Sequence, residues 1–351
     1  MMMVAVMAAV IWGIGWAMDT PKRARWIMIA LLLVAVMAVQ IALPDGHPLR
    51  AATGSDPRLW ALVIVFAALI LGYRGLLRRL RARAQPEPKA TTAPVAKPGF
   101  SDTELDRYAR HIMLREIGGT GQKALRDAKV LVVGAGGLGA PALQYLAAAG
   151  VGTIGVVDDD VVDNSNLQRQ VIHTDNRIGQ PKVQSAMAAM TAQNPFITVR
   201  PYNRRLTDDI AHDLIADYDI VLDGTDNFAT RYLMNATCVA AQKPLVAAAL
   251  TQWEGQISIY DPAHDAPCYA CLFPEAPAPG LVPTCAEAGV LGPLPGVIGA
   301  MMAVETVKLI TGAGDPLRNR LLIYDALYAE TRVIKAARRA DCATCGDAPL
   351  P

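Results

Sequence analysis

The chain has 351 residues, and its 33 Lys and Arg residues nearly balance its 32 Asp and Glu residues, for a net charge of +1. This balance argues against a strongly basic nucleic-acid-binding protein, so no nucleic-acid partner is expected. Hydrophobic residues make up 52% of the chain and the mean hydropathy is +0.25. These values indicate a membrane segment joined to a water-soluble domain.

Three apolar runs occupy the first part of the chain, at residues 1–18, 26–43 and 59–73. A helix needs about 20 apolar residues to cross a bilayer, so the first two runs approach that length and the third is shorter. The first run lacks the charged start and the small-residue cleavage site of a signal peptide. We expect three transmembrane helices; the alternative is two such helices and a third that lies in the membrane interface.

Positive charges around these runs predict their orientation. The loop between the first two runs contains Lys22, Arg23 and Arg25, whereas the second loop has only Arg50 and Arg58. Because positive loops stay in the cytoplasm, the N-terminus is expected outside. The chain is therefore expected to be a multi-pass protein of the inner (cytoplasmic) membrane whose large C-terminal domain is cytoplasmic. A further group of arginines follows the third run: Arg74, Arg78, Arg79, Arg81 and Arg83.

The composition changes at residues 84–100, where prolines and small residues are typical of a semi-extended linker. We therefore expect a membrane anchor at residues 1–83, this linker, and a domain at residues 101–351. In that domain strand-like and helix-like segments alternate, which predicts an α/β fold with a doubly wound, mostly parallel sheet covered on both faces. The apolar stretch 294–310 contains two charged residues and begins beside two prolines, so it is expected in the core.

A glycine-rich turn lies between an apolar run at residues 130–133 and an alanine-rich helical stretch at residues 140–149. Such a turn at a helix N-terminus lets backbone N–H groups approach phosphate, so it predicts a nucleotide site. The next strand-like run ends at Asp158, where a carboxylate can accept hydrogen bonds from ribose hydroxyls. A nicotinamide dinucleotide site and a turn used only for packing are the alternatives. The glycines are Gly134, Gly136, Gly137 and Gly139.

Charged residues beyond the turn argue against a dinucleotide site. Arg169 and Lys182 follow closely, and a second strand-like run at residues 218–223 leads to Asp226. Mg²⁺ is commonly held by one or two carboxylates together with substrate phosphates, so Asp226 is a candidate ligand; a helix N-cap or turn residue is the alternative. A substrate carboxylate is already ionised at neutral pH, so its attack on the α-phosphorus of a nucleotide needs cations and no general base.

From Tyr108 to Gly346 the chain resembles the ThiF/MoeB/HesA family, the prokaryotic relatives of ubiquitin-activating enzymes. The resemblance rests on residues 107–110, the glycine-rich turn, residues 165–170, residues 179–182, residues 225–227 and two late cysteine pairs. It implies a Rossmann-like fold and an ATP- and Mg²⁺-dependent adenylyltransferase. The implied substrate is the C-terminal Gly-Gly carboxylate of a small ubiquitin-like sulfur carrier (MoaD/ThiS-like), which serves molybdopterin- or thiamine-type sulfur transfer, and pyrophosphate is released.

The same resemblance implies roles for particular residues. Asp226 and Asn227 would serve the metal and the phosphates. Arg110 would reach the nucleotide of a neighbouring subunit, which implies a homodimer; the alternative is a solvated charge on a helix that Ser101 and Glu104 open as a capping box. No rhodanese-like domain follows the last cysteine pair, so a separate sulfur donor is expected. The residues implied to contact ATP are Gly137, Asp158, Ser165, Asn166, Leu167, Gln168, Arg169 and Lys182.

Cysteines give an independent signal. Four of them form two C-x-x-C pairs, the ligand set of a closed, structural zinc (Zn²⁺) site; redox pairs are the alternative. Cys285 has no paired neighbour, and the resemblance offers it a catalytic role as acceptor of an acyl group or of sulfur, while the alternative is a thiol in a loop. Cys238 is expected in the core. The zinc ligands would be Cys268, Cys271, Cys342 and Cys345.

No histidine-based catalytic pair stands out. Two other functional classes stay open: an ATP-dependent tRNA-modifying dehydratase on the same fold, and a membrane-tethered nucleotide-binding protein without adenylation activity. A dehydratase would favour a basic surface, and a binding protein would not need Arg169, Lys182 and Asp226 together. The histidines are expected at the surface, at helix caps or in the outer loop: His47, His111, His173, His212 and His264.

Overall fold

The computed structural model describes most residues between 2 and 76 and all residues in 99–277 and 288–346. The chain forms two compact units, Met1–Lys97 and Pro98–Pro351, which are described separately. The predicted linker at residues 84–100 lies almost entirely outside the described residues, and Cys285 lies outside them as well.

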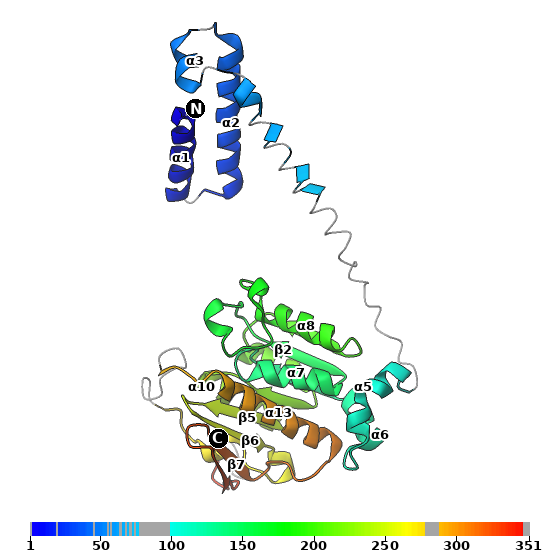
Figure 1. Cartoon of the computed structure of the whole chain (residues 1–351). Helices are drawn as coiled ribbons and strands as arrows, with labels where there is room; N and C mark the ends of the chain where they lie inside the picture. Colours follow the sequence, from blue (N-terminus) through cyan, green and yellow to red (C-terminus); the bar gives the residue numbers. More distant parts are fainter. Residues whose placement is uncertain are drawn as a thin grey trace. The chain divides into compact units, whose positions relative to one another are not determined.

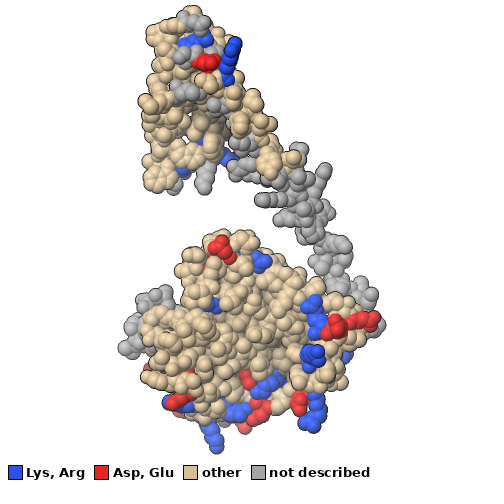
Figure 2. Space-filling view, viewed as in Figure 1, with Lys and Arg blue, Asp and Glu red and all other residues tan. Residues whose placement is uncertain are grey.

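The described part of the first unit contains helices α1 (Met2–Ala17), α2 (Lys22–Ala42) and α3 (Pro48–Thr53). Val4 and Val36 are buried against Trp60. Large apolar side chains on the outward faces of α1 and α2 are exposed, and Figure 2 shows few charges along this unit except near its ends.

Two helices among the described residues are long and apolar enough to cross a membrane, Arg23–Ala42 in the first unit and Pro293–Thr311 in the second. α1 is a shorter apolar helix, and the third predicted run, residues 59–73, is described only in part. The length and composition of Arg23–Ala42 therefore support one full membrane span in the first unit. The predicted total of three spans stays a prediction.

The second unit is built on an eight-stranded sheet with the strand order β3-β2-β1-β4-β5-β6-β7-β8. Neighbouring strands from β3 to β5 in this order are parallel, and those from β5 to β8 are antiparallel. The strands are β1 (Lys129–Val133), β2 (Thr153–Val157), β3 (Thr198–Tyr202), β4 (Ile220–Asp223), β5 (Leu245–Leu250), β6 (Glu254–Tyr260), β7 (Arg320–Asp325) and β8 (Glu330–Lys335).

The prediction of a mostly parallel sheet is correct for one half of this sheet and wrong for the other. Residues 251–253 connect β5 to β6, and residues 326–329 connect β7 to β8. A parallel crossover needs a dozen or more residues, so each of these short connections forces an antiparallel hairpin. The sheet is therefore mixed.

Helices cover both faces of the sheet, because successive side chains in each strand point to opposite sides. Val130 and Val132 of β1 pack with one group of helices, whereas Leu131 and Val133 pack with the other. The first group contains α7 (Gly139–Ala149), α8 (Lys182–Gln193) and α13 (Pro293–Thr311), which lie in front of the strands in Figure 1. The second contains α9 (Asp208–Ala216), α10 (Phe228–Ala240) and α11 (Tyr269–Leu272).

The core position predicted for residues 294–310 is confirmed. Leu294, Ile298 and Met302 of α13 are at most 1% exposed and pack into the core. Glu305 keeps its charge paired there, since its carboxylate accepts hydrogen bonds from Lys308 Nζ at 2.7 Å and from a backbone N–H at 2.7 Å. α13 is therefore an apolar helix of the domain core.

Helix α5 (Asp102–Ile112) precedes the sheet, followed by α6 (Gly118–Asp127). The predicted capping box is confirmed, because Ser101 accepts from the backbone of Glu104 and the Glu104 carboxylate accepts from the backbone of Ser101. Short 3₁₀ helices η1 (Asn164–Asn166), η2 (Asp175–Arg177) and η3 (Pro262–His264) complete the described unit.

Candidate nucleotide site and cysteine cluster

A cavity of about 740 Å³ lies over the carboxyl ends of β1, β2, β4 and β5. Open α/β sheets bind ligands at this edge, and the volume falls within the range of small-molecule sites. Gly139 and residues 165–168 lie outside its wall. The predicted site residues that line it are Gly134, Gly136, Gly137, Asp158, Arg169, Lys182, Asp226 and Asn227.

The glycine-rich turn packs closely against the end of β4. Gly134 has φ +94°, which favours glycine, and a Cβ there would lie 2.8 Å from the carbonyl oxygen of Gly224. A Cβ at Gly139 would lie 1.8 Å from the carbonyl oxygen of Gly134. Gly139 is therefore required for the turn to close at the start of α7.

The N–H groups of Gly136 and Gly137 are available to a ligand. Within residues 99–277 and 288–346, no protein oxygen accepts a hydrogen bond from either N–H group. α7 begins two residues after Gly137, so the positive end of its dipole lies at the same place. Together these features form an anion site suited to phosphate.

Asp158 links the glycine-rich turn to the end of β2. Its carboxylate accepts hydrogen bonds from the backbone N–H of Ala135 at 2.7 Å and from that of Asp160 at 2.8 Å. The side chain also lines the cavity. Asp158 therefore orients the turn in addition to offering a carboxylate to a ribose.

Two positively charged side chains, Lys182 and Arg169, also line the cavity. Lys182 at the start of α8 is only 4% exposed, and its Nζ lies 2.7 Å from Asp160 Oδ2. Arg169 donates to Asn166 Oδ1 at 2.8 Å and to the carbonyl oxygen of Ser165 at 3.2 Å. Residues 165 and 166 therefore orient Arg169 from behind the cavity wall.

The loop after β4 presents Asp226 to the cavity. Asn227 caps α10, because its Oδ1 accepts from the backbone N–H of Thr230 at 2.8 Å. The helix-capping role considered as the alternative for Asp226 thus belongs to its neighbour. Asp226 itself is exposed and has no hydrogen bond or ion pair among the described residues, so its carboxylate is available for a metal ion.

A buried ion pair that the sequence did not predict lies beneath this loop. Arg231 of α10 is 5% exposed and its Nε lies 3.1 Å from Asp223 Oδ2 at the end of β4. Arg231 also donates to the carbonyl oxygens of Thr225 and Ala248, at 3.0 and 2.8 Å. Opposite charges in two apolar segments could have signalled this pair, which supports the loop that carries Asp226.

The surface or capping position expected for His173 is wrong. The imidazole is 5% exposed and lies between Ser185 of α8 and the carbonyl oxygen of Ala135. It follows η1 in a short irregular segment, which resembles a surface loop in sequence. Packing of α8 against this segment, which no local pattern reveals, covers the ring.

Arg110 lies outside the cavity of its own chain. It is exposed on α5, where Nη1 lies 4.0 Å from the sulfur of Met113. This position is compatible with a solvated charge and with a contact to a second subunit.

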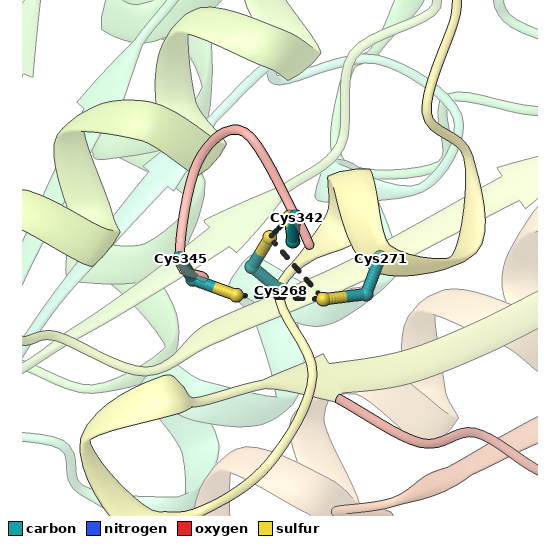
Figure 3. A group of neighbouring side chains, drawn as sticks. All are labelled: Cys268, Cys271, Cys342 and Cys345. Carbon is teal, nitrogen blue, oxygen red and sulfur yellow. Dashed lines mark hydrogen bonds between the residues drawn. The ribbon is translucent and has the colours of Figure 1, made fainter. Parts of the chain in front are cut away.

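The four paired cysteines come together in one buried cluster, although the two pairs are far apart in sequence (Figure 3). The sulfur separations are 3.9 Å for Cys268–Cys271, 3.6 Å for Cys268–Cys342 and 3.4 Å for Cys271–Cys345. Four sulfurs about 2.3 Å from a tetrahedral zinc ion are about 3.8 Å apart, whereas a disulfide is about 2.05 Å long. The donor set therefore fits zinc.

The surroundings of the cluster suit a metal site closed to solvent. All four cysteines are at most 7% exposed. Burial raises the pKa of the Cys268 and Cys271 thiols, whereas hydrogen bonds from the backbone of Cys345 and Thr344 lower the pKa of Cys342 to about 7 despite its burial. A bound cation would compensate the charge of the thiolates. The Arg339 backbone N–H also donates to Cys271 Sγ at 3.5 Å.

The fold and the glycine-rich turn define an α/β nucleotide-binding protein. A model of the ThiF family matches residues 108–344, all within the second unit, and the chain belongs to this family.

Several relatives match over most of their own length. The chain is 50% identical over 245 residues to the SAMP-activating enzyme E1 of Haloferax volcanii, covering 70% of this chain and 90% of that protein. It is 49% identical over 254 residues to the sulfur carrier protein adenylyltransferase of Thermus thermophilus, covering 71% and 94%. A crystal structure of E. coli MccB with MccA-N7isoASN has a TM-score of 0.62 at 24% identity, covers 69% of this chain and 75% of that one, and shares the fold.

Proposed function

We propose that this chain adenylates the C-terminal Gly-Gly carboxylate of a small ubiquitin-like sulfur carrier, using ATP and Mg²⁺ and releasing pyrophosphate. The observation that carries the proposal is the cavity, which combines Lys182 and Arg169 with groups that have no partner among the described residues: the N–H groups of Gly136 and Gly137 and the carboxylate of Asp226. The relatives named as sulfur carrier adenylyltransferase and SAMP-activating enzyme support the same reaction.

The chemistry follows from charge. The attacking carboxylate is ionised at neutral pH, so the site has no proton to remove and must instead bring an anion to the α-phosphorus. The glycine N–H groups hold the phosphates, and Lys182 and Arg169 neutralise charge that builds up as pyrophosphate leaves. Mg²⁺ would be held by Asp226 and the phosphates, with Asn227 beside them, and would supply further electrostatic stabilisation.

Other parts of the proposal concern partners. A homodimer would let Arg110 reach the partner subunit's nucleotide from its exposed position on α5. Sulfur would come from a separate donor protein, with Cys285 as a candidate acyl or sulfur acceptor. Zinc in the cysteine cluster would be structural, since it would join α11 and its N-cap to the C-terminal end of the described chain.

We further propose that residues 1–83 anchor the enzyme in the inner membrane and that the linker at residues 84–100 holds the catalytic domain in the cytoplasm. The exposed apolar faces of α1 and α2 and the length of α2 support an anchor. The arginines around the apolar runs support the orientation.

ATP–pyrophosphate exchange tests the reaction. Exchange should depend on a carrier that ends in Gly-Gly and should vanish with the same carrier lacking its last glycine. If the protein binds ATP but shows no exchange with any carrier of this class, it is a nucleotide-binding protein and the proposed reaction is wrong.

Removal of the anchor should leave catalysis intact. A chain that begins at Lys97 should be water-soluble and should support exchange within about 2-fold of the full-length rate in detergent, because contacts across a domain linker are few. A shortened chain that folds and binds zinc, yet has lost exchange activity, would show that the first unit does more than anchor the enzyme.

A further inference from the structure

His173 is a buried polar residue for which the proposed reaction has no use. Its Nε2 lies 3.0 Å from the carbonyl oxygen of Ala135, and its Nδ1 lies 2.9 Å from Ser185 Oγ. Ala135 is the second residue of the glycine-rich turn, and Ser185 lies on α8, three residues after Lys182. The imidazole therefore joins the turn that faces the phosphates to the helix that supplies a cation.

These contacts define the tautomer of the neutral ring. A carbonyl oxygen can only accept, so Nε2 must carry the hydrogen that binds Ala135. In the neutral ring Nδ1 then accepts from the Ser185 hydroxyl. The Ser185 carbonyl oxygen is held separately by Arg177 Nη1.

The Ala135 peptide is thereby held from both sides. Its N–H donates to Asp158 Oδ2 at 2.7 Å, and its carbonyl oxygen accepts from His173. Ala135 is fully buried, and the next two residues are Gly136 and Gly137, whose N–H groups have no acceptor among the described residues. The Ala135 carbonyl shares its planar peptide group with the N–H of Gly136, so the hydrogen bond from His173 orients that N–H. The N–H of Gly137 shares its peptide group with the Gly136 carbonyl, which accepts from the Ala140 N–H at 2.9 Å.

We infer that His173 is a positioning residue that holds the Ala135 peptide so that the N–H groups of Gly136 and Gly137 converge on the ATP phosphates. The inference rests on the proposed binding of ATP in this cavity. It assigns His173 no contact with ATP or with the carrier.

Burial, with help from two nearby cations, favours the neutral form of the ring. Burial lowers the pKa of His173 from its ordinary 6.5, and Lys182 of α8 and Arg177 of η2 also lower it, against the hydrogen bond to Ala135 and the charge of Asp158. A histidine with a depressed pKa in the folded state contributes stability above its unfolded pKa, and this is lost as the pH falls through the folded-state pKa. The neutral tautomer is therefore the form present at neutral pH.

Substituting His173 by glutamine or by asparagine distinguishes the hydrogen bond to the Ala135 carbonyl from the mere presence of a polar side chain at this position. Glutamine has the reach to place an N–H near the Nε2 position, whereas asparagine reaches only as far as Nδ1. His173→Gln should keep the Kd for Mg–ATP within about 3-fold of the wild type, and His173→Asn should raise it about 10-fold or more. The test is calorimetric titration of the full-length chain in detergent with Mg–ATP, and His212→Asn on exposed α9 is the control that should change nothing.

The outcomes are distinguishable. Equal Kd values for His173→Gln and His173→Asn would show that His173 has only a structural role and would overturn the inference. A wild-type chain that does not bind Mg–ATP would overturn the proposed function and the inference with it. Should His173→Asn fail to fold, Ser185→Ala is the second variant, because it removes the hydroxyl that holds His173 Nδ1 and should raise the Kd for Mg–ATP about 3-fold. A wild-type Kd in Ser185→Ala would contradict the assignment.

Discussion

Replacement of Asp226 by alanine should lower ATP–pyrophosphate exchange by more than about 100-fold, a loss of about 2.7 kcal/mol of transition-state stabilisation. The carboxylate faces the cavity from the loop after β4 and has no partner among the described residues, so its removal takes away the proposed metal ligand and no protein contact. The Tm and the zinc content should therefore stay at their wild-type values. Exchange assays at several Mg²⁺ concentrations, with a thermal melt of each variant, measure both effects.

Asp213→Ala is the matched control, because its side chain is 97% exposed on α9 and lies away from the nucleotide cavity. The control should retain full exchange. If Asp226→Ala keeps exchange at the level of Asp213→Ala, Asp226 does not hold the metal ion.

Replacement of Cys345 by serine should remove zinc and destabilise the domain. Binding of structural zinc is coupled to folding, so loss of one thiolate should cost about 3 kcal/mol or more. For a domain of this size such a loss corresponds to a fall in Tm of about 6–12 °C. Elemental analysis of the purified chain and a thermal melt with and without added zinc measure the two consequences together.

Cys238→Ser provides the comparison. Cys238 is buried in α10 and packs in the core away from the cluster, so the same chemical change there should leave zinc at one equivalent. Full zinc occupancy in a well-folded Cys345→Ser variant would rule out ligation by all four paired cysteines.

Motifs with local causes were predictable from the sequence. The glycine-rich turn requires glycine because its backbone packs against β4, and the capping box of α5 depends on residues 101 and 104 alone. The core position of α13 was also predictable, since its charged residues and flanking prolines distinguish it from a membrane span. The two C-x-x-C pairs indicated a shared zinc site, and the structure brings their sulfurs together.

Features that depend on contacts between segments distant in sequence could not be predicted. The buried position of His173 follows from the packing of α8 against the segment after η1, and the Asp223–Arg231 pair follows from the placement of α10 beside β4. The antiparallel part of the sheet follows from two short hairpins, β5–β6 and β7–β8, and from the return of the chain through α13 to place β7 beside β6, none of which the strand patterns record. Residue type and spacing were therefore enough to identify the groups that can bind a nucleotide or a metal, because they define that chemistry. The buried groups that hold the glycine-rich turn and the Asp226 loop in place emerge only from the folded chain, because burial and hydrogen bonding join residues that no local pattern connects.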